Sequence, residues 1–260
     1  AALLAARRKA PEITQRDLEA AIEKVVAGPE RRSRRLNAEE KRRVAYHEVG
    51  HALVAAHSAH ADPVHKISIV PRGRAALGYT MQLPGEDQFL LTRAELFDRL
   101  CGLLGGRAAE EIVFGEVSTG AQNDLERATA IARQMVALYG MSERIGLVNC
   151  VQRQSLFLAG PEAPLQRDCS EQTAREIDEE VKSLLDHAYA KAKEILTEHR
   201  DQLEKVTTEL LARETLDGPE FYRLVGREMP QAREPVPPLP APVATPATRA
   251  ENPAPPVRHE

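Results

Sequence analysis

The segment His47-Glu48-Val49-Gly50-His51 places two histidines four residues apart with a glutamate beside the first. Apolar residues at helical spacing surround the segment, and Asn37 with Glu40 offers the reciprocal cap that begins a helix. Four residues advance a helix by about 400° and about 6 Å, so both imidazoles reach one zinc ion at about 2.0–2.1 Å. Glu48 lies about 100° round the helix, where a carboxylate serves as general base toward water at the metal.

A catalytic zinc site needs a third protein ligand, and the other histidines are poor candidates. His57 stands where a third histidine follows in the pattern H-E-x-x-H-x-x-G-x-x-H, but Val54 occupies the position of its glycine. Without that glycine the helix has no reason to turn back toward the metal. His60 and His65 follow no ligand spacing. We therefore expect none of these three histidines to bind the ion.

Carboxylates on later predicted helices are better candidates for the third ligand. Glu110 and Glu111 stand near the end of one predicted helix, and Asp124 stands in the first turn of the next. A helix N-terminus stabilises a carboxylate by roughly 0.3–1 kcal/mol, which favours Asp124. Spacing and residue type alone leave Asp124 and Glu111 both open, with capping or ion pairing as the alternative role of all three carboxylates.

The pattern of apolar residues predicts a mainly helical fold with one small sheet and a long C-terminal helical region. Helices are predicted over residues 14–26, 37–56, 92–114, 121–139 and 173–214. Thr14 with Asp17 and Thr92 with Glu95 offer N-terminal caps, and the first helix carries an apolar stripe of Leu18, Ile22 and Val25. Residues 173–214 form one long helix or two antiparallel helices broken near 199–201. Strands are predicted over 64–70 and 77–83, and residues 145–168 are expected to form a loop. Pro71 indicates that the first strand is an edge strand. Gly105-Gly106 predicts a close approach of another backbone, because each glycine costs a helix about 1 kcal/mol relative to alanine.

Composition and charge argue against several classes of protein. Thirty-five basic and thirty-nine acidic residues leave a net charge of −4. The arginine-rich residues 31–35 and 41–43 lack interleaved aromatics, so we do not expect nucleic-acid binding. Three cysteines without C-x-x-C spacing indicate neither a disulfide framework nor a zinc knuckle. No run of about eighteen apolar residues occurs, and the chain as given is expected to be soluble.

The chain divides into four predicted parts. Residues 1–28 form a helical piece that begins without methionine, as a fragment of a longer protein would. Residues 29–35 are expected to be a linker that acts as a hinge, since Gly28 and a following proline end the helix. Residues 36–226 form the main domain. Residues 227–260 are expected to be disordered, because ten of the eighteen prolines lie beyond residue 229 and few large apolar side chains accompany them.

Five stretches of the chain together resemble one known family. They are Ala2-Leu3-Leu4-Ala5-Ala6-Arg7, Tyr46-His47-Glu48-Val49-Gly50-His51-Ala52, His65-Lys66-Ile67-Ser68-Ile69-Val70-Pro71-Arg72-Gly73, Leu104-Gly105-Gly106-Arg107-Ala108-Ala109-Glu110-Glu111 and Thr119-Gly120-Ala121-Gln122-Asn123-Asp124-Leu125. In these stretches the chain resembles the FtsH family of membrane-anchored AAA+ zinc metalloproteases, from residue 1 to about residue 226. The resemblance implies that Asp124 is the third zinc ligand beside His47 and His51, with Glu48 as the catalytic residue. Val49 stands where the family usually has alanine, on the side of the helix that carries no ligand.

The same resemblance implies cofactors, partners and location. One zinc ion per chain is expected, whereas ATP and Mg²⁺ would bind only in a longer parent protein, because no G-x-x-x-x-G-K-[ST] motif occurs here. Residues 1–28 would be the end of an AAA+ lid. The parent would be a homo-hexamer on the cytoplasmic side of the inner membrane, anchored by a segment outside this chain. Its substrates would be unfolded membrane and soluble polypeptides.

Two further roles and one alternative function follow from these patterns. The predicted edge strand is expected to hold an extended substrate, since such a strand offers unpaired N–H and C=O groups. Its residues are Lys66, Ile67, Ser68, Ile69 and Val70. Gly28 is expected to be the hinge point between the lid remnant and the protease domain. The alternative function is a non-catalytic, zinc-stabilised oligomerisation module, and Glu48 favours catalysis because a purely structural site needs no base beside it.

Overall fold

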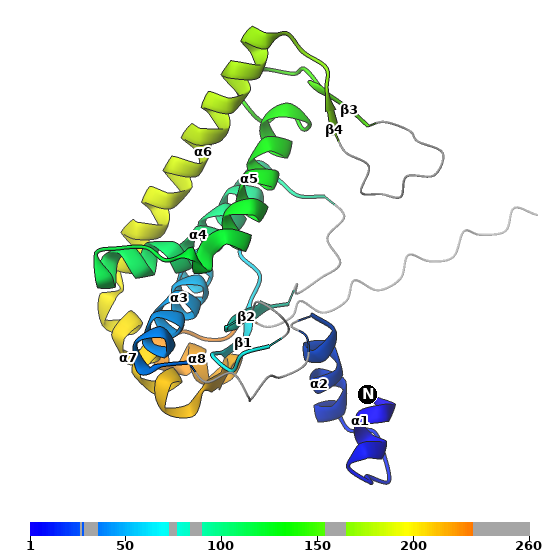
Figure 1. The fold of residues 1–260 in the computed structure, drawn as a ribbon, viewed down its shortest axis with the longest axis vertical. Coiled ribbons are helices and arrows are strands. Elements are labelled where there is room, and N and C mark those ends of the chain that lie inside the picture. Colours follow the sequence, from blue (N-terminus) through cyan, green and yellow to red (C-terminus); the bar gives the residue numbers. More distant parts are fainter. Residues whose placement is uncertain (27, 29–35, 73–76, 84–89, 154–164, 231–260) are drawn as a thin grey trace, which may run out of the picture.

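The computed structural model describes residues 1–26, 28, 36–72, 77–83, 90–153 and 165–230 (Figure 1). This part of the chain is mainly helical with a small sheet, which confirms the predicted fold class. The predicted linker at 29–35 and residues 231–260 of the predicted tail lie outside it. Among the described helices, none combines the length and the apolar character that crossing a membrane requires.

The elements of the described part follow one another along the chain as helices interrupted by short strands. The helices are α1 (Ala2–Arg7), α2 (Gln15–Val26), α3 (Ala38–His57), α4 (Arg93–Phe114), the 3-10 turn η1 (Thr119–Ala121), α5 (Gln122–Ala137), α6 (Glu171–Glu198), α7 (Arg200–Arg213) and α8 (Gly218–Val225). The strands are β1 (Val64–Ser68), β2 (Tyr79–Gln82), β3 (Val151–Arg153), β4 (Leu165–Arg167) and β5 (Thr215–Asp217).

Helices α3 and α4 begin at the two capping boxes that the sequence predicted. The Asn37 side chain accepts the N–H of Glu40 at 2.7 Å, and the Glu40 carboxylate accepts the N–H of Asn37 at 3.2 Å. Thr92 and Glu95 form the same reciprocal pair ahead of α4. Each cap satisfies N–H groups that have no partner inside the helix, and a cap is worth about 1 kcal/mol.

The backbones of α3 and α4 touch where they cross, as the glycine pair predicted. A Cβ atom on Gly50 would lie 2.5 Å from the carbonyl oxygen of Gly105, and one on Gly105 would lie 2.8 Å from that of Gly50. No larger residue fits at either position without moving a helix. This contact presses the histidine-bearing turn of α3 against α4.

The other long helices surround this pair. Helix α6 packs along α4 and α5, and α7 turns away to pack on α3 (Figure 1). The predicted break is confirmed at His199, but the two helices do not form an antiparallel pair. The core between the helices is aliphatic, with Leu53, Leu100 and Leu196 fully buried.

The three-stranded sheet corrects one prediction. Its order is β2-β1-β5, with both pairings antiparallel, so β1 is the central strand and its predicted edge position is wrong. The third strand comes from residues 215–217, whose short stretch carries no strand pattern but whose Leu216 is fully buried. Beyond the ladder, the N–H of Ile69 donates to the carbonyl of Glu214 at 3.0 Å.

The expected substrate strand therefore has no free edge along most of its length. Partners on β2 and β5 flank each member of the segment from residue 66 to residue 68. The prediction that this strand binds a substrate through its main chain is wrong for residues 66–68, which are paired on both sides. For Ile69 and Val70 the prediction loses its basis, because it rested on an edge position. The five residues concerned are Lys66, Ile67, Ser68, Ile69 and Val70.

Three further elements were not predicted. Strands β3 and β4 form an antiparallel pair inside the stretch expected to be a loop, because a ladder of three residues on each side leaves almost no pattern in the sequence. Helix α8 follows β5 directly, with Pro219 in its first turn. All three of these elements are short.

The N-terminal helices pack on each other. Asp17 accepts both the N–H and the hydroxyl of Thr14, at 3.0 Å and 2.8 Å, which confirms the predicted carboxylate cap of α2. The predicted apolar stripe of α2 is solvent-exposed, at 46% for Leu18, 46% for Ile22 and 85% for Val25. Gly28 has a φ of +82°, a left-handed conformation that suits the residue after a helix.

Candidate metal centre

Two imidazoles from α3 and one carboxylate from the first turn of α5 converge at one point. His47 and His51 lie one turn apart, with ring centroids separated by 4.7 Å. Nε2 of each ring lies 3.4 Å from Oδ2 of Asp124. One ligand atom from each residue lies within 4.8 Å of the other two, and no other trio of His, Cys, Asp or Glu in the described ranges meets this criterion. The structure thus brings the three predicted ligands together.

The spacing fits a tetrahedral zinc ion. Ligand atoms at about 2.0–2.1 Å from such an ion lie about 3.4 Å from one another. Both nitrogen–oxygen separations are 3.4 Å, whereas the hydrogen bond from His47 to Glu110 is 2.7 Å long. Two imidazoles and one carboxylate are a donor set that catalytic zinc sites use, with the fourth position open.

Gly106 leaves the space in which the ion would sit. A Cβ atom on Gly106 would lie 2.6 Å from Nε2 of His47 and 2.6 Å from Nε2 of His51. Any side chain there would compete with a metal for the same two nitrogens. The adjacent glycines therefore have separate roles, since Gly105 allows the helix crossing and Gly106 allows the site.

Glu110 orients the ring of His47 through Nδ1, the nitrogen that does not face Asp124. Its Oε1 lies 2.7 Å from Nδ1 of His47, and its Oε2 accepts the N–H of Ser118 at 2.7 Å. Arg43 approaches Oε2 at 3.7 Å. Because Nδ1 donates to this carboxylate, Nε2 is left unprotonated to face the ion. The sequence placed Glu110 among the candidate ligands. No local sequence pattern distinguishes a metal ligand from a residue that hydrogen-bonds to a ligand.

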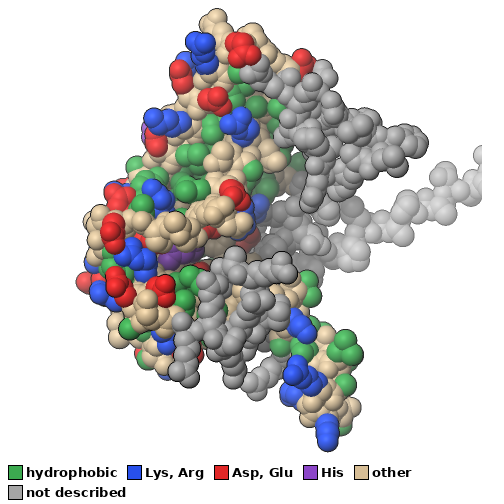
Figure 2. Space-filling view, in the orientation of Figure 1, with side chains coloured by type: hydrophobic (Ala, Val, Ile, Leu, Met, Phe, Trp, Pro, Cys, Tyr) green, Lys and Arg blue, Asp and Glu red, His purple; other side chains and the backbone are tan. Residues whose placement is uncertain are grey.

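His51 is held in the same tautomer by a different partner. Its Nδ1 lies 2.8 Å from the carbonyl oxygen of Gly102 on α4 and donates to it. Both histidines therefore present Nε2 to the same point. The side chains of His47 and His51 are 10% and 13% exposed, and Figure 2 shows histidine on this face mainly as a small recessed area.

Glu48 lies beside the ligands without belonging to them. It is 7% exposed, and the hydroxyl of Thr80 on β2 lies 2.9 Å from its Oε2. Burial raises the pKa of the Glu48 carboxyl above its ordinary value of 4.5, which brings it toward the range of a general base working near neutral pH.

The metal-free ligands shift one another's pKa values. Burial would lower the pKa of His47, but hydrogen bonds to Asp124 and Glu110 outweigh burial and raise this pKa from 6.5 to about 10. Burial would raise the pKa of Asp124, yet the two imidazoles hold it well below its usual range. Both shifts show that the point where these side chains meet favours positive charge, as a cation site does.

The remaining candidates lie elsewhere. Glu111 binds Lys193 at 2.8 Å and also accepts from Tyr189, on another face of α4. His57 stacks on His199 with ring centroids 3.6 Å apart, and His60 lies 3.0 Å from Asp98. His65 is likewise outside the ligand group. The predicted exclusion of these three histidines from the ligand group agrees with the structure.

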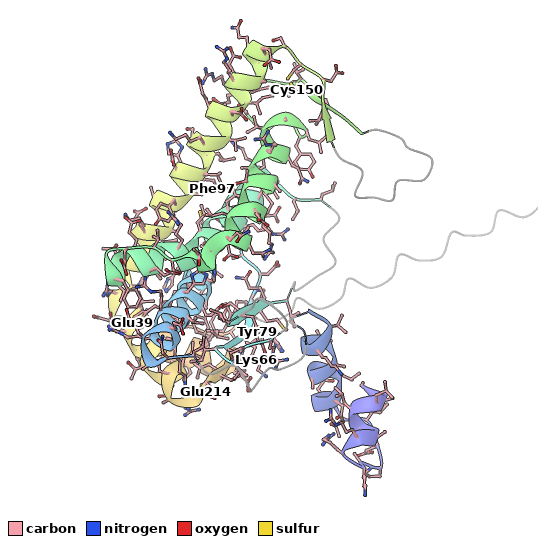
Figure 3. All side chains as sticks on the ribbon, in the orientation of Figure 1. Glu39, Lys66, Tyr79, Phe97, Cys150 and Glu214 are labelled. Carbon is pink, nitrogen blue, oxygen red and sulfur yellow. The ribbon has the colours of Figure 1, made fainter. Side chains whose placement is uncertain are left out.

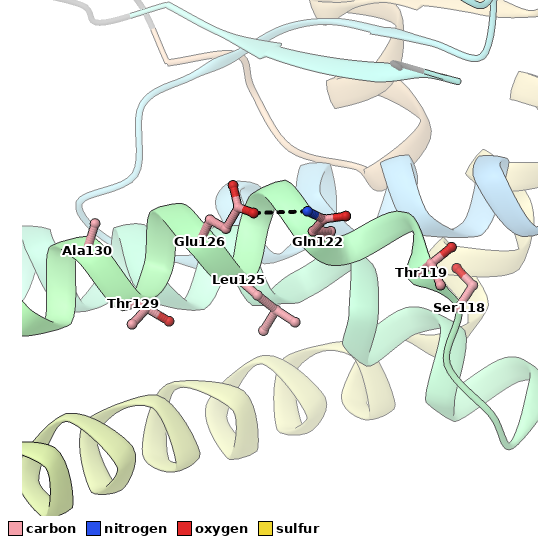
Figure 4. Close-up of a pocket in the computed structure, with 7 residues that line it drawn as sticks. All are labelled: Ser118, Thr119, Gln122, Leu125, Glu126, Thr129 and Ala130. Carbon is pink, nitrogen blue, oxygen red and sulfur yellow. Dashed lines mark hydrogen bonds between the residues drawn. The ribbon is translucent and has the colours of Figure 1, made fainter. Parts of the chain in front are cut away.

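An open groove runs along α5 but does not include the metal centre (Figure 4). At 100° per residue, its helical lining lies mostly opposite Asp124 on α5. The Gln122 amide donates to Glu126 at 3.0 Å along this face. The lining residues are Ser118, Thr119, Gln122, Leu125, Glu126, Thr129 and Ala130.

Comparisons with known proteins agree with this geometry. The model of peptidase family M41 matches residues 34–224. The ATP-dependent zinc metalloprotease FtsH 1 of Methylacidiphilum infernorum (isolate V4) is 55% identical over 234 residues, which are 90% of this chain and 37% of that protein. FtsH of Thermotoga maritima is 50% identical over 235 residues, 90% of this chain and 38% of that protein. FtsH 1 of Thermomicrobium roseum is 50% identical over 258 residues, which are 98% of this chain and 39% of that protein. This chain spans well under half of each relative, and it belongs to peptidase family M41.

Proposed function

We propose that this chain is the zinc-dependent endopeptidase part of a longer ATP-dependent protease. The observation that carries the proposal is the convergence of His47, His51 and Asp124 at tetrahedral spacing, with a buried glutamate directly beside them. Structural zinc sites use four protein ligands, whereas the described residues supply three here. Glu48 is then free to act on a substrate.

Each residue of the site has a separate role in the proposed hydrolysis. Zinc held by the three side chains would supply a Lewis acid that polarises the scissile carbonyl and lowers the pKa of water. The Glu48 carboxylate takes the proton of the attacking water and passes it to the leaving amine nitrogen. Glu110 and the carbonyl of Gly102 keep both imidazoles in the tautomer that presents Nε2.

Peptide hydrolysis by the wild-type chain and by Glu48→Gln tests this function. We expect the variant to lose about 10²–10⁴-fold in kcat, the usual contribution of a general base. Zinc content, measured on the same samples, should not change, because Glu48 is outside the ligand group. Equal hydrolysis by both proteins would contradict catalysis and favour the non-catalytic oligomerisation module, for which Glu48 has no use.

The properties of the whole protein extend the proposal. The relatives are named ATP-dependent, and this chain corresponds to 37–39% of their length in the three compared above. We infer that ATP and Mg²⁺ bind in the parent outside this chain, that the parent is a membrane-anchored homo-hexamer facing the cytoplasm, and that unfolded polypeptides are its substrates. Sedimentation of the detergent-solubilised parent tests the hexamer, and a dimer or monomer would contradict it.

The domain assignment belongs to the same proposal. Residues 1–28 would end an AAA+ lid, residues 36–226 would be the protease domain, and Gly28 would be the hinge between them. Gly28→Leu in the parent should then impair ATP-coupled degradation of a protein substrate while sparing cleavage of a short peptide. Equal loss, or no loss, on both substrates would contradict the hinge.

A further inference from the structure

Strand β2 lies directly against the side chain of Glu48. Thr80 Oγ1 lies 2.9 Å from Oε2 of Glu48 and 2.9 Å from its backbone oxygen. Just before the strand begins, a Cβ atom on Gly78 would lie 2.8 Å from both Cγ and Oε1 of Glu48. Figure 3 marks this strand by Tyr79 and its neighbour β1 by Lys66. Thr80 of β2 and Gly78 just before the strand therefore border the two carboxylate oxygens.

The Thr80 hydroxyl is itself held in place by the sheet. Thr80 pairs with Ile67 on the central strand β1, and Ile67 is fully buried in the core. Thr80 is only partly exposed, and its branched side chain has few rotamers. A donor anchored in this way has a fixed position relative to α3.

A fixed donor matters for a glutamate. The terminal torsion of a glutamate side chain is broad and roughly two-fold, so an unsupported carboxylate samples many orientations. The hydrogen bond from Thr80 restricts that torsion and assigns Oε2 to the protein. Oε1 is left as the oxygen that acts as the base, and the absence of a side chain on Gly78 keeps the space beside Oε1 open.

We propose that Thr80 is a positioning residue for the reaction. Its hydroxyl holds Oε2 of Glu48 so that Oε1 accepts the proton of the attacking water. This inference rests on the proposed peptidase function, because an oriented base has a use only if Glu48 acts on a substrate. Thr80 contacts neither the metal ligands nor the scissile bond in this account.

Thr80→Val tests the inference, because valine keeps the branched shape and removes only the hydroxyl. With a short fluorogenic peptide, we expect kcat of the 260-residue chain to fall about 10- to 100-fold, as loss of a hydrogen bond to a charged group does. KM and zinc content should stay at their wild-type values, and the melting temperature should fall by no more than a few degrees. Thr80→Ser should restore kcat to within about threefold of wild type, since serine keeps the hydroxyl.

Thr215→Val is the matched control. Thr215 lies on the other outer strand, β5, with its hydroxyl 3.2 Å from that of Ser68. Removing it alters the same sheet without touching Glu48, so kcat should stay at the wild-type value. A Thr80→Val protein with wild-type kcat would overturn the inference, and so would a serine variant as slow as the valine one. Loss of zinc or of melting temperature in proportion to kcat would show a structural role and also overturn it.

Glu48→Gln, measured alongside, separates this inference from the function on which it rests. If the wild-type chain hydrolyses peptide much faster than Glu48→Gln and Thr80→Val equals wild type, only the positioning role fails. If the wild-type chain is no faster than Glu48→Gln, the peptidase proposal fails and the positioning role fails with it.

Discussion

The carboxylate of Glu110 lies 2.7 Å from Nδ1 of His47, on the opposite side of the ring from Asp124. The same carboxylate is 1% exposed and accepts the N–H of Ser118 at 2.7 Å. A buried carboxylate with donors on both oxygens has a fixed position, and so has the ring that it holds. This relationship connects the end of α4 with the segment that leads to Asp124.

Glu110→Gln should lower the affinity for zinc about 10- to 100-fold, the usual effect of losing the partner of a metal-binding histidine. Glutamine offers one acceptor and one NH₂ group where two donors, from His47 and Ser118, face the side chain. Competition with a zinc chelator measures the change. Glu111→Gln is the control, because Glu111 binds Lys193 instead and its loss should leave zinc affinity unchanged. Equal affinities of the two variants would contradict the role of Glu110.

Gly106→Ala should abolish zinc binding while the chain stays folded. The new methyl group would lie 2.6 Å from both Nε2 atoms. Gly102→Ala is matched to it on the same helix, because a Cβ there meets nothing within 4 Å and the carbonyl that accepts from His51 is retained. The control should bind zinc normally and gain up to about 1 kcal/mol of stability from helix propensity. Metal analysis measures the zinc content of both proteins, and thermal melting measures their stability. Full zinc occupancy in Gly106→Ala would contradict the claim that residue 106 borders the ion.

Gly50→Ala should destabilise the domain by about 1–3 kcal/mol, the usual cost of overpacking. Its Cβ would lie 2.5 Å from a backbone oxygen of α4, so the helices must separate. Urea unfolding measures the free energy. A variant as stable as wild type would show that α3 and α4 do not touch at this point.

The contact between Asp17 and Thr14 should weaken only at low pH. Hydrogen bonds from the backbone and the side chain of Thr14 lower the pKa of Asp17 from 3.8 to about 2, and Arg8 adds to the effect. Because the folded pKa is below the unfolded one, the stabilisation is present above pH 3.8 and is lost as the pH falls through about 2. NMR titration of the Thr14 amide, which donates to Asp17 at 3.0 Å, reports the transition. A midpoint at the ordinary value would contradict the contact, and Asp17→Asn should show no transition.

Local chemistry in the sequence located the principal helices. The caps at Asn37 and Thr92 placed the starts of α3 and α4 to within one residue, because each cap depends on side chains three positions apart. Gly105 and Gly106 predicted a close backbone approach for a similar reason, since their cost inside a helix needs a compensation. The histidine pair is also local, one helical turn apart.

Long-range pairing was beyond the sequence. Strand β5 forms only because residues 215–217 meet β1, and the contact between Ser68 and Thr215 spans 147 positions. Since no local pattern reports such a pairing, the edge position that Pro71 indicated for β1 was wrong. Asp124 is 77 positions from His47, and the residues alone left Asp124 and Glu111 both open as the third ligand. In the structure, the packing of α5 and α6 on α4 places Asp124 beside the histidines and Glu111 beside Lys193. Thr80 carried no signal at all, because its role depends on where β2 passes over α3.

An anomalous-scattering measurement at the zinc absorption edge, made on crystals of the zinc-loaded chain, tests the central claim most directly. The account predicts one zinc ion per chain, bound by Nε2 of His47, Nε2 of His51 and one oxygen of Asp124, with no fourth protein ligand. A fourth side chain on the ion, or an Asp124 that points away from it, would contradict the account.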